Sequence, residues 1–291
     1  MKHIANNAQN RLLEDAVRGR DDCSAKLLNA EQIALFSLKK IRSDWKMKTD
    51  NPDVVGLDVI SLLPPVVIKI KFTHLVDPQT GLGYVTSARR IKMVKALNKT
   101  FKDSGISFKS AKTQYVYNTD FCYDMEDPAT EAIVKQNYHF DPDKYLNIYT
   151  AELSTQLGWA TFPVEWVFPP NNPNKWMDGV VVWHGIFPGG LNPQYNQGKR
   201  VVHEVGHWLG LFHTFENGCA GNGDDITDTP AHKQANTGVP PEGANNGACN
   251  PLEQAPIHNF MNYTDDVCMT HFTPEQVEKM RKLMQLFRPG L

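Results

Sequence analysis

The stretch HEVGHWLGLFH, residues 203–213, places three histidines and a glutamate at spacings that suit metal chemistry. Residues four apart on an α-helix project from one face, so His203 and His207 are placed to bind the same ion. A continued helix would carry His213 too far along and around, so the chain must bend after the second histidine. Gly210 is best suited to make that bend, because glycine adopts positive φ without a Cβ clash.

Three neutral imidazoles leave a fourth coordination position for water, which is typical of a catalytic zinc site. Glu204 follows the first histidine and can act on that water as a general base. The alternative is a helix with ordinary core or surface histidines, because the short HExxH pattern also occurs by chance. The full HExxHxxGxxH pattern arises by chance in a chain of this length on the order of once in ten thousand. We therefore predict one catalytic Zn²⁺, with His203, His207 and His213 as its ligands.

The composition places these residues in an ordinary globular protein. The chain has 291 residues, of which 41% are hydrophobic and 21% charged, which is enough to bury a core. The net charge of -2 argues against a nucleic-acid-binding surface, which normally carries a basic excess. No apolar run approaches the roughly 20 residues that a membrane span requires.

The cysteines and the N-terminus bear on the compartment. Three of the five cysteines lie in the loop-like final quarter of the chain, which suggests at least one disulfide and an oxidising compartment, although free buried thiols are the alternative. The first residues show no apolar signal-peptide core. We expect a secreted, monomeric protein whose signal is absent from this sequence, with an injected effector as the alternative.

The rest of the chain predicts an α/β organisation after a charged, helix-rich segment over residues 1–50. Apolar residues alternate over 64–75 as in a half-buried strand, and residues 178–187 are apolar enough for a strand buried on both faces. Further strands are predicted over 144–153 and 157–163, the latter at a sheet edge because of its proline. Helices are predicted over 88–105, with Ile91, Val94, Leu97 and Phe101 on one face, and over 273–287, with Thr273 as N-cap.

A methionine-containing turn follows the histidine helix in HNFMNYTDD, residues 258–266. Together with HEVGHWLGLFHTF and GDDITDTP, this stretch resembles the pappalysin family of metzincin zinc peptidases, and its ulilysin-like microbial members most closely. The resemblance is specific from about residue 199 to 281. It implies a twisted mixed sheet with the active-site helix in an upper part, up to about residue 210, and an irregular lower part over 211–291. Residues 51–291 would form the catalytic domain, and residues 1–50 a pro-segment.

The resemblance also implies an endopeptidase and the roles of several side chains. Protein or peptide substrates would pair with the edge strand at 157–163. Tyr263 would stabilise the oxyanion together with zinc, and Met261 would form a hydrophobic floor beneath the metal. Asp266 would lie at the base of the S1′ pocket and select Arg or Lys after the scissile bond. The alternative for Asp266 is a solvated loop carboxylate.

Two cysteines and an acidic loop match further features of the family. Cys219 and Cys249 match cysteines that bridge the loops around the site, whereas Cys268 would be free or paired with Cys122. The family's calcium-binding stretch suggests Ca²⁺ ligands at Asp224, the carbonyl oxygen of Thr227, and Thr229, although Lys233 stands where an acidic residue is expected. Asp228 would otherwise cap a turn.

The N-terminal segment suggests latency. Cys23 could bind the zinc as a thiolate and displace the catalytic water, or Asp21 or Asp22 could do so as a carboxylate. The alternative is an ordinary surface cysteine, because Ser24 replaces the glycine that usually follows such a cysteine in the family. With basic P1′ specificity, the segment could be removed by self-cleavage, for example before Arg42.

Two other functions compete with a peptidase. A catalytically silent zinc-binding module would typically lose the glutamate, but Glu204 is present. A metallohydrolase acting on another substrate class would not be expected to combine the histidine motif with Tyr263 in the methionine turn.

Overall fold

The structure is a computed structural model that describes residues 63–163, 172–190, 192–220 and 223–291. The predicted pro-segment over residues 1–50, and with it Cys23 and the bond before Arg42, lies outside the described residues.

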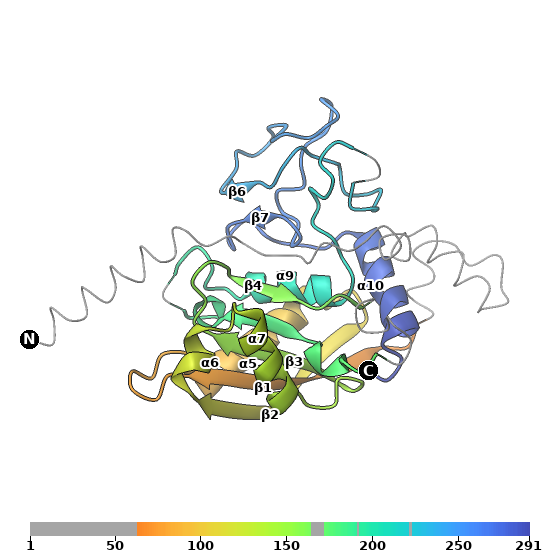
Figure 1. Ribbon diagram of the computed structural model, residues 1–291. Helices are drawn as coiled ribbons and strands as arrows, with labels where there is room; N and C mark the ends of the chain where they lie inside the picture. The colour runs from red at the N-terminus through yellow and green to blue at the C-terminus, as the bar shows by residue number, and fades with distance from the viewer. Residues whose placement is uncertain (1–62, 164–171, 191, 221–222) are drawn as a thin grey trace, which may run out of the picture.

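A five-stranded sheet forms the base of the fold, in the order β2-β1-β3-β5-β4 (Figure 1). Its first four strands are parallel, and the short β4 pairs with β5 in antiparallel orientation. Because β4 is at the edge of the sheet, the prediction of an edge strand within residues 157–163 is confirmed. The strands are β1 (Val66–Val76), β2 (Ile106–Tyr117), β3 (Tyr145–Ala151), β4 (Gly158–Ala160) and β5 (Val180–Trp183).

Helices cover both faces of this sheet. On one side α5 contacts β2, α9 contacts β4 and β5, and the two helices pack together. Adjacent residues of β4 point to opposite faces, since Gly158 faces α9 whereas Trp159 bonds to Glu131 of α7. The mixed sheet and its helices confirm the predicted α/β class. The helices are α5 (Ser87–Thr100), α6 (Thr119–Tyr123), α7 (Pro128–Tyr138) and α9 (Lys199–Trp208), with short 3₁₀ turns η1 (Lys175–Met177) and η2 (His184–Ile186).

Burial corrects two sequence predictions. From Phe72 to Val76, β1 is buried on both faces and not half-buried, because helices cover the sheet from both sides. In α5 the buried residues are Met93 and Leu97, while Ile91 is 56% exposed. The apolar face of α5 therefore does not include Ile91. The prediction of β5 as fully buried is confirmed.

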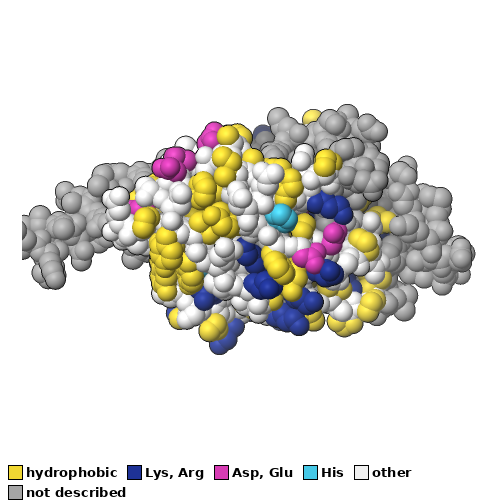
Figure 2. Space-filling model, turned by 60° about the horizontal axis from the view of Figure 1, so that its bottom comes forward, with side chains coloured by type: hydrophobic (Ala, Val, Ile, Leu, Met, Phe, Trp, Pro, Cys, Tyr) yellow, Lys and Arg dark blue, Asp and Glu magenta, His cyan; other side chains and the backbone are white. Residues whose placement is uncertain are grey.

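The other edge strand, β2, has a polar outer surface. Its residues 109–114 are exposed and include Lys109 and Lys112. Lys and Arg side chains gather on the face shown in Figure 2, where the lower part of the molecule is turned forward. Lysines on an edge strand disfavour pairing with another chain, which is the simplest role for the two on β2.

Residues 209–273 are mostly irregular and lie on the other side of α9 and β4 from the body of the sheet (Figure 1). Among the described residues of this stretch, the named strands are the two-residue pair β6 (Thr237–Gly238) and β7 (Tyr263–Thr264). The chain then returns alongside the sheet as α10 (Pro274–Phe287), where the predicted N-cap Thr273 forms a capping box with Gln276. Arg281 of α10 donates to the carbonyl oxygen of Pro64 at 2.6 Å, which fastens this helix to the start of the sheet.

The predicted disulfide between Cys219 and Cys249 is present within the irregular region. Cys122 and Cys268 are both buried free thiols, so their pairing is excluded. Within the described part of the chain, no helix is long and apolar enough to cross a membrane.

Candidate metal centre

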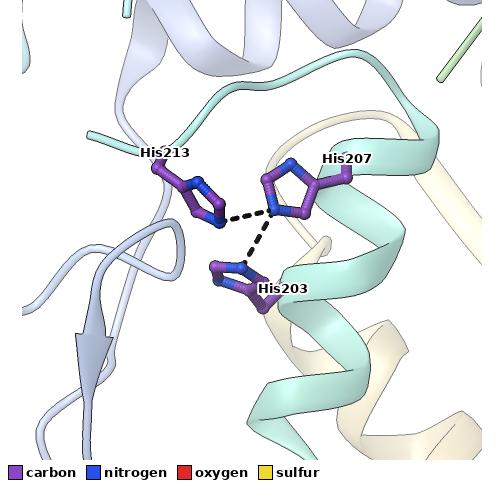
Figure 3. A group of neighbouring side chains, drawn as sticks. All are labelled: His203, His207 and His213. Carbon is purple, nitrogen blue, oxygen red and sulfur yellow. Dashed lines mark hydrogen bonds between the residues drawn. The ribbon is translucent and has the colours of Figure 1, made fainter. Parts of the chain in front are cut away.

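Helix α9 presents two histidines on one buried face. His203 and His207 are one turn apart, and their Nε2 atoms lie 3.0 Å from each other (Figure 3). Both side chains are almost completely buried, between the sheet and the C-terminal loops. The helical spacing thus brings the rings together as the sequence predicts.

A bend after α9 brings in the third histidine. The helix ends at Trp208, and Gly210 has a φ of 100°, in the region where glycine alone is unstrained. The N–H of Gly210 donates to the carbonyl oxygen of His207 at 2.8 Å and closes the last turn. His213 then lies with its Nε2 3.0 Å from that of His207 (Figure 3). The predicted convergence of the three rings is therefore observed.

Hydrogen bonds on the far side of two rings fix their tautomers. Nδ1 of His203 lies 2.7 Å from the carbonyl oxygen of Phe260, and Nδ1 of His207 lies 2.7 Å from that of Leu211. A carbonyl oxygen only accepts, so each Nδ1 carries the proton and each Nε2 presents a lone pair. Two lone pairs 3.0 Å apart repel each other, whereas a cation between them would bind both. The donor set therefore fits a metal ion.

Burial keeps the imidazoles in the form that binds metals. Loss of solvent lowers the pKa of His207 to about 4, and lowers the pKa values of His203 and His213 well below the ordinary value. The rings are therefore neutral near pH 7. Within the described residues, these three form the group of neighbouring ligand side chains suited to a metal ion.

Glu204 lies between the metal-binding face and the edge strand. Its side chain is only 1% exposed. A Cβ at Gly158 of β4 would lie 3.2 Å from Cγ of Glu204 and 2.7 Å from the carbonyl oxygen of Val181. Glycine at this position therefore lets β4 approach α9 closely, which places the carboxylate beside the strand.

Tyr263, in β7, brings a hydroxyl group to the histidines. Its oxygen lies 3.1 Å from Nε2 of His213. Arg200, in the first turn of α9, donates from Nη2 to the carbonyl oxygens of Tyr263 and Thr264 at 2.8 and 2.9 Å. These bonds join the helix to the loop and fix the position of the tyrosine.

Met261 is fully buried beneath the histidine helix. A Cβ at Gly206 would lie 2.5 Å from the sulfur of Met261, so the helix can approach the turn only because residue 206 is a glycine. The contact places Met261 against α9 between the first two histidines, where a hydrophobic floor is predicted.

Two asparagines that flank Met261 were not predicted to matter. Asn259 exchanges amide hydrogen bonds with Gln276 at 2.8 and 3.1 Å, and its Oδ1 accepts from the N–H of Met261. Asn262 accepts from the N–H of Asn236 and donates to its side chain. The two asparagines on either side of Phe260 and Met261 in HNFMNY are the signal that could have found them, since buried asparagines satisfy the backbone groups of turns.

Asp266 is fully buried at the N-terminus of α9. Its Oδ2 accepts from the backbone N–H groups of Gln197 and Lys199 at 2.8 and 3.3 Å, while Oδ1 has no hydrogen-bond partner among the described residues. Burial raises the pKa of Asp266, an effect opposed by the positive charge of Arg200. The carboxylate therefore caps the helix with one oxygen and leaves the other available, and it is not a solvated loop residue.

Two of the predicted calcium ligands are in contact. Thr229 donates to the carboxylate oxygens of Asp224 at 2.8 Å, while the hydroxyl group of Thr227, whose carbonyl oxygen is the predicted ligand, donates to Glu275. The ammonium group of Lys279 lies 3.3 Å from the carbonyl oxygen of Asp224. A calcium ion here would have to coexist with that positive charge. Asp228 accepts from the N–H of Glu275 at the start of α10, as in its predicted alternative role as a cap.

The model of peptidase family M43, pregnancy-associated plasma protein-A, matches residues 129–285. An extracellular metalloprotease of Sordaria macrospora is 35% identical over 221 residues, which are 75% of this chain and 74% of that protein. The chain belongs to peptidase family M43. This M43 peptidase is therefore a metalloendopeptidase, as its three-histidine cluster and pappalysin-like motifs led us to expect.

Other relatives extend over more of the chain. An extracellular metalloprotease of Colletotrichum graminicola is 33% identical over 255 residues, or 87% of this chain and 88% of that protein. Among solved structures, Tannerella forsythia promirolysin is 26% identical, with a TM-score of 0.71, and covers 93% of this chain and 96% of its own. Mature mirolysin in complex with a cleaved peptide is 26% identical, with a TM-score of 0.64, and covers 79% and 98%.

Proposed function

We propose that this M43 peptidase cleaves peptide bonds with one zinc ion bound by His203, His207 and His213. The observation that supports this assignment most strongly is the pair of Nδ1–carbonyl hydrogen bonds, which turn the free Nε2 lone pairs of His203 and His207 toward each other. A bound zinc ion would supply Lewis acidity and lower the pKa of a water molecule. Hydrolysis of a quenched peptide, abolished by a zinc chelator and restored by added Zn²⁺, tests this proposal. Activity that persists without metal contradicts it.

Glu204 is proposed as the general base and Tyr263 as the group that stabilises the oxyanion. The Glu204 carboxylate would take a proton from the attacking water and pass it to the leaving amide nitrogen. The Tyr263 hydroxyl group would donate a hydrogen bond to the carbonyl oxygen as negative charge develops there. Their positions against β4 and beside His213 support these roles.

The substrate is proposed to extend along β4 as an added strand. The strand is at the sheet edge and lies directly against Glu204, so a peptide paired with it would carry its scissile bond close to the base. Strand pairing recognises backbone groups and leaves sequence selection to side-chain sites. Mature mirolysin, which was solved with a cleaved peptide, is a relative in which this placement can be compared.

Basic P1′ specificity is proposed for Asp266. Its buried Oδ1 has no hydrogen-bond partner among the described residues, and an arginine or lysine side chain would provide one together with the opposite charge. The second oxygen caps α9, so the carboxylate would be held in place before substrate binds. Asp266 would then both cap the helix and select the substrate.

The substitution Asp266→Asn separates these two roles. The amide oxygen can still accept from the N–H groups of Gln197 and Lys199, while the negative charge is lost. We expect the preference for Arg over a neutral residue at P1′ to fall roughly 10- to 100-fold, as the loss of a charge-assisted hydrogen bond implies. Thermal stability should change little. A peptide-library profile that stays selective for Arg and Lys would contradict the assignment.

Synthesis as a latent, secreted zymogen is also proposed. Promirolysin covers 93% of this chain and mature mirolysin 79%, and the difference is similar in extent to the predicted pro-segment over residues 1–50. Several relatives are named extracellular metalloproteases. N-terminal sequencing of incubated wild type and Glu204→Ala tests self-processing before a basic residue such as Arg42. Identical processing of both proteins would rule out self-cleavage, and unchanged latency in Cys23→Ser would exclude the thiolate.

Calcium binding at Asp224, Thr227 and Thr229 stays a prediction. Burial raises the pKa of Asp224, and a bound divalent cation would oppose this effect. Calorimetric titration with CaCl₂, with Asp224→Asn as the control, would detect such a site. Equal heats for the two proteins would exclude it.

A further inference from the structure

A single carboxylate holds the loop that leads into β4. Glu126, between α6 and α7, accepts backbone N–H bonds from Ser154 at 3.0 Å, Thr155 at 2.9 Å and Gln156 at 3.0 Å. It also accepts from the hydroxyl groups of Ser154 and Thr155, the latter at 2.8 Å. Five donors on three consecutive residues therefore meet one side chain that is distant in sequence.

A second carboxylate of the same region holds the strand itself. Glu131 of α7 accepts from Nε1 of Trp159, the central residue of β4, at 2.7 Å. Glu131 is in turn paired with Lys135 at 2.7 Å, and the Lys135 ammonium group donates to the carbonyl oxygen of Met177. Glu131, Lys135 and Trp159 are all buried. Trp159 is therefore fixed from the face of the sheet opposite to Glu204.

The strand needs such support because it is short. β4 has three residues, and the sheet pairs it on one side only, with β5. An edge strand that receives a peptide must keep an extended backbone before the peptide arrives, because ordering it on binding would weaken affinity. The two carboxylates fix the chain immediately before the strand and at its centre.

We propose that Glu126 and Glu131 are positioning residues that hold β4 in the conformation to which the peptide substrate pairs. This inference rests on the proposed pairing of substrate with β4. Glu126 bonds to the loop before the strand and Glu131 bonds to the strand itself, so both would act through β4 and not on the reacting atoms.

The ionisation of Glu126 is consistent with this role. Burial alone would raise its pKa, but the hydrogen bonds from Ser154 and Thr155 outweigh burial, so the pKa of Glu126 is lowered overall. The side chain is therefore a carboxylate at neutral pH and can accept from all five donors.

The variant Glu126→Gln tests the proposal. Glutamine keeps the size of the side chain but turns an N–H₂ group toward donors that need an acceptor. The matched control is Glu253→Gln, which makes the same change at an exposed loop residue remote in sequence from β4. Two peptides with the same scissile bond are compared, one spanning four residues on each side and the other two. Zinc content and thermal unfolding are measured for every variant.

For the long peptide we expect KM to rise roughly three- to tenfold in Glu126→Gln. This is the effect of losing one or two backbone hydrogen bonds between the substrate and β4. The value of kcat and the zinc content should stay near wild type, and the short peptide should be affected less. Trp159→Phe, which removes the indole N–H together with part of the ring system, should show a smaller change of the same kind. The control variant should match wild type.

Two results would overturn the proposal. One is an unchanged KM for the long peptide in both Glu126→Gln and Trp159→Phe. The other is an equal loss on long and short peptides together with lost zinc or a lower unfolding temperature, which indicates a role in stability alone. A wild-type enzyme that does not favour the longer peptide would instead contradict the pairing of substrate with β4, and is thereby distinguished from failure of the positioning role.

Discussion

The two regions that meet at the metal centre hold their functional side chains in different ways. Helix α9, which packs on the sheet, carries His203, Glu204 and His207 on one continuous helix whose packing face is apolar and buried. The region over 209–273, which has little regular secondary structure, carries His213 and Tyr263. In the first region position follows from helix geometry, whereas in the second each residue needs its own fixed contacts.

Polar side chains provide those contacts in the irregular region. The amide pair of Asn259 and Gln276 ties the methionine turn to α10, and Asn262 ties it to Asn236. The Cys219–Cys249 disulfide adds a covalent link. A site can therefore combine a rigid helical half with a loop half stabilised by buried amides and a cross-link. The predictions below test this division.

The largest expected effect is on catalysis, in a comparison of one residue from each region. Glu204→Gln should lower kcat/KM by about 10²- to 10⁴-fold, because a general base is lost. Tyr263→Phe should lower it by up to about 10²-fold, because zinc shares the stabilisation of the oxyanion. Steady-state kinetics with zinc content as control measures both. A larger loss for the tyrosine variant would reverse the proposed roles.

The next effect concerns the end of the histidine helix. Arg288 forms two 2.7 Å bonds with Asp178 and lies over the ring of Trp208, whose N–H also donates to Asp178. All three are buried. Arg288→Ala would leave the Asp178 carboxylate without its cation, so we expect the free energy of unfolding to fall by about 3–5 kcal/mol. Urea denaturation measures it, and a loss below 1 kcal/mol would show that this cluster does not stabilise the helical half.

A smaller effect should be confined to the loop half. In the double variant Cys219→Ser and Cys249→Ser, we expect the free energy of unfolding to fall by about 2–4 kcal/mol, as for other disulfides that close loops. Hydrogen exchange should accelerate over residues 213–264 but not in β1 or β5. Equal acceleration in both regions would mean that they unfold as one unit, against the division proposed above.

The smallest effect lies where the two regions touch. Gly206→Ala would place a methyl group against the sulfur of Met261. Such overpacking should lower the free energy of unfolding by about 1–3 kcal/mol. Met261→Ala makes room, so the double variant should be more stable than the sum of the single effects predicts. Thermal unfolding of all four proteins gives the coupling energy. Strict additivity would show that the contact is not tight.

The sequence predicted best what depends on local periodicity. The 3.6-residue repeat was enough to pair His203 with His207, and Gly210 was enough to predict the bend that brings His213 back. Thr273 and the apolar run of β5 were also predicted from local signals. The disulfide between Cys219 and Cys249 came from the family resemblance and not from spacing.

What the sequence did not predict depends on contacts between distant segments. β2 was missed because its exposed lysine-rich surface shows little alternation, and its order comes from pairing with β1. The contacts of Glu126 were missed because its partners lie 28–30 residues away. Ile91 was assigned to the buried face of α5 because an apolar residue at helical spacing does not reveal which side meets the sheet.

Zinc coordination tests the central claim most directly. X-ray absorption of the zinc-loaded protein should show one zinc per chain, with three nitrogen ligands at about 2.0–2.1 Å. The variant His213→Ala, which removes only the ligand from the loop half, should keep two nitrogen ligands and bind zinc more weakly in chelator competition. A protein that binds no zinc, or a His213→Ala variant with unchanged coordination and affinity, would contradict a centre built jointly by the helix and the loop.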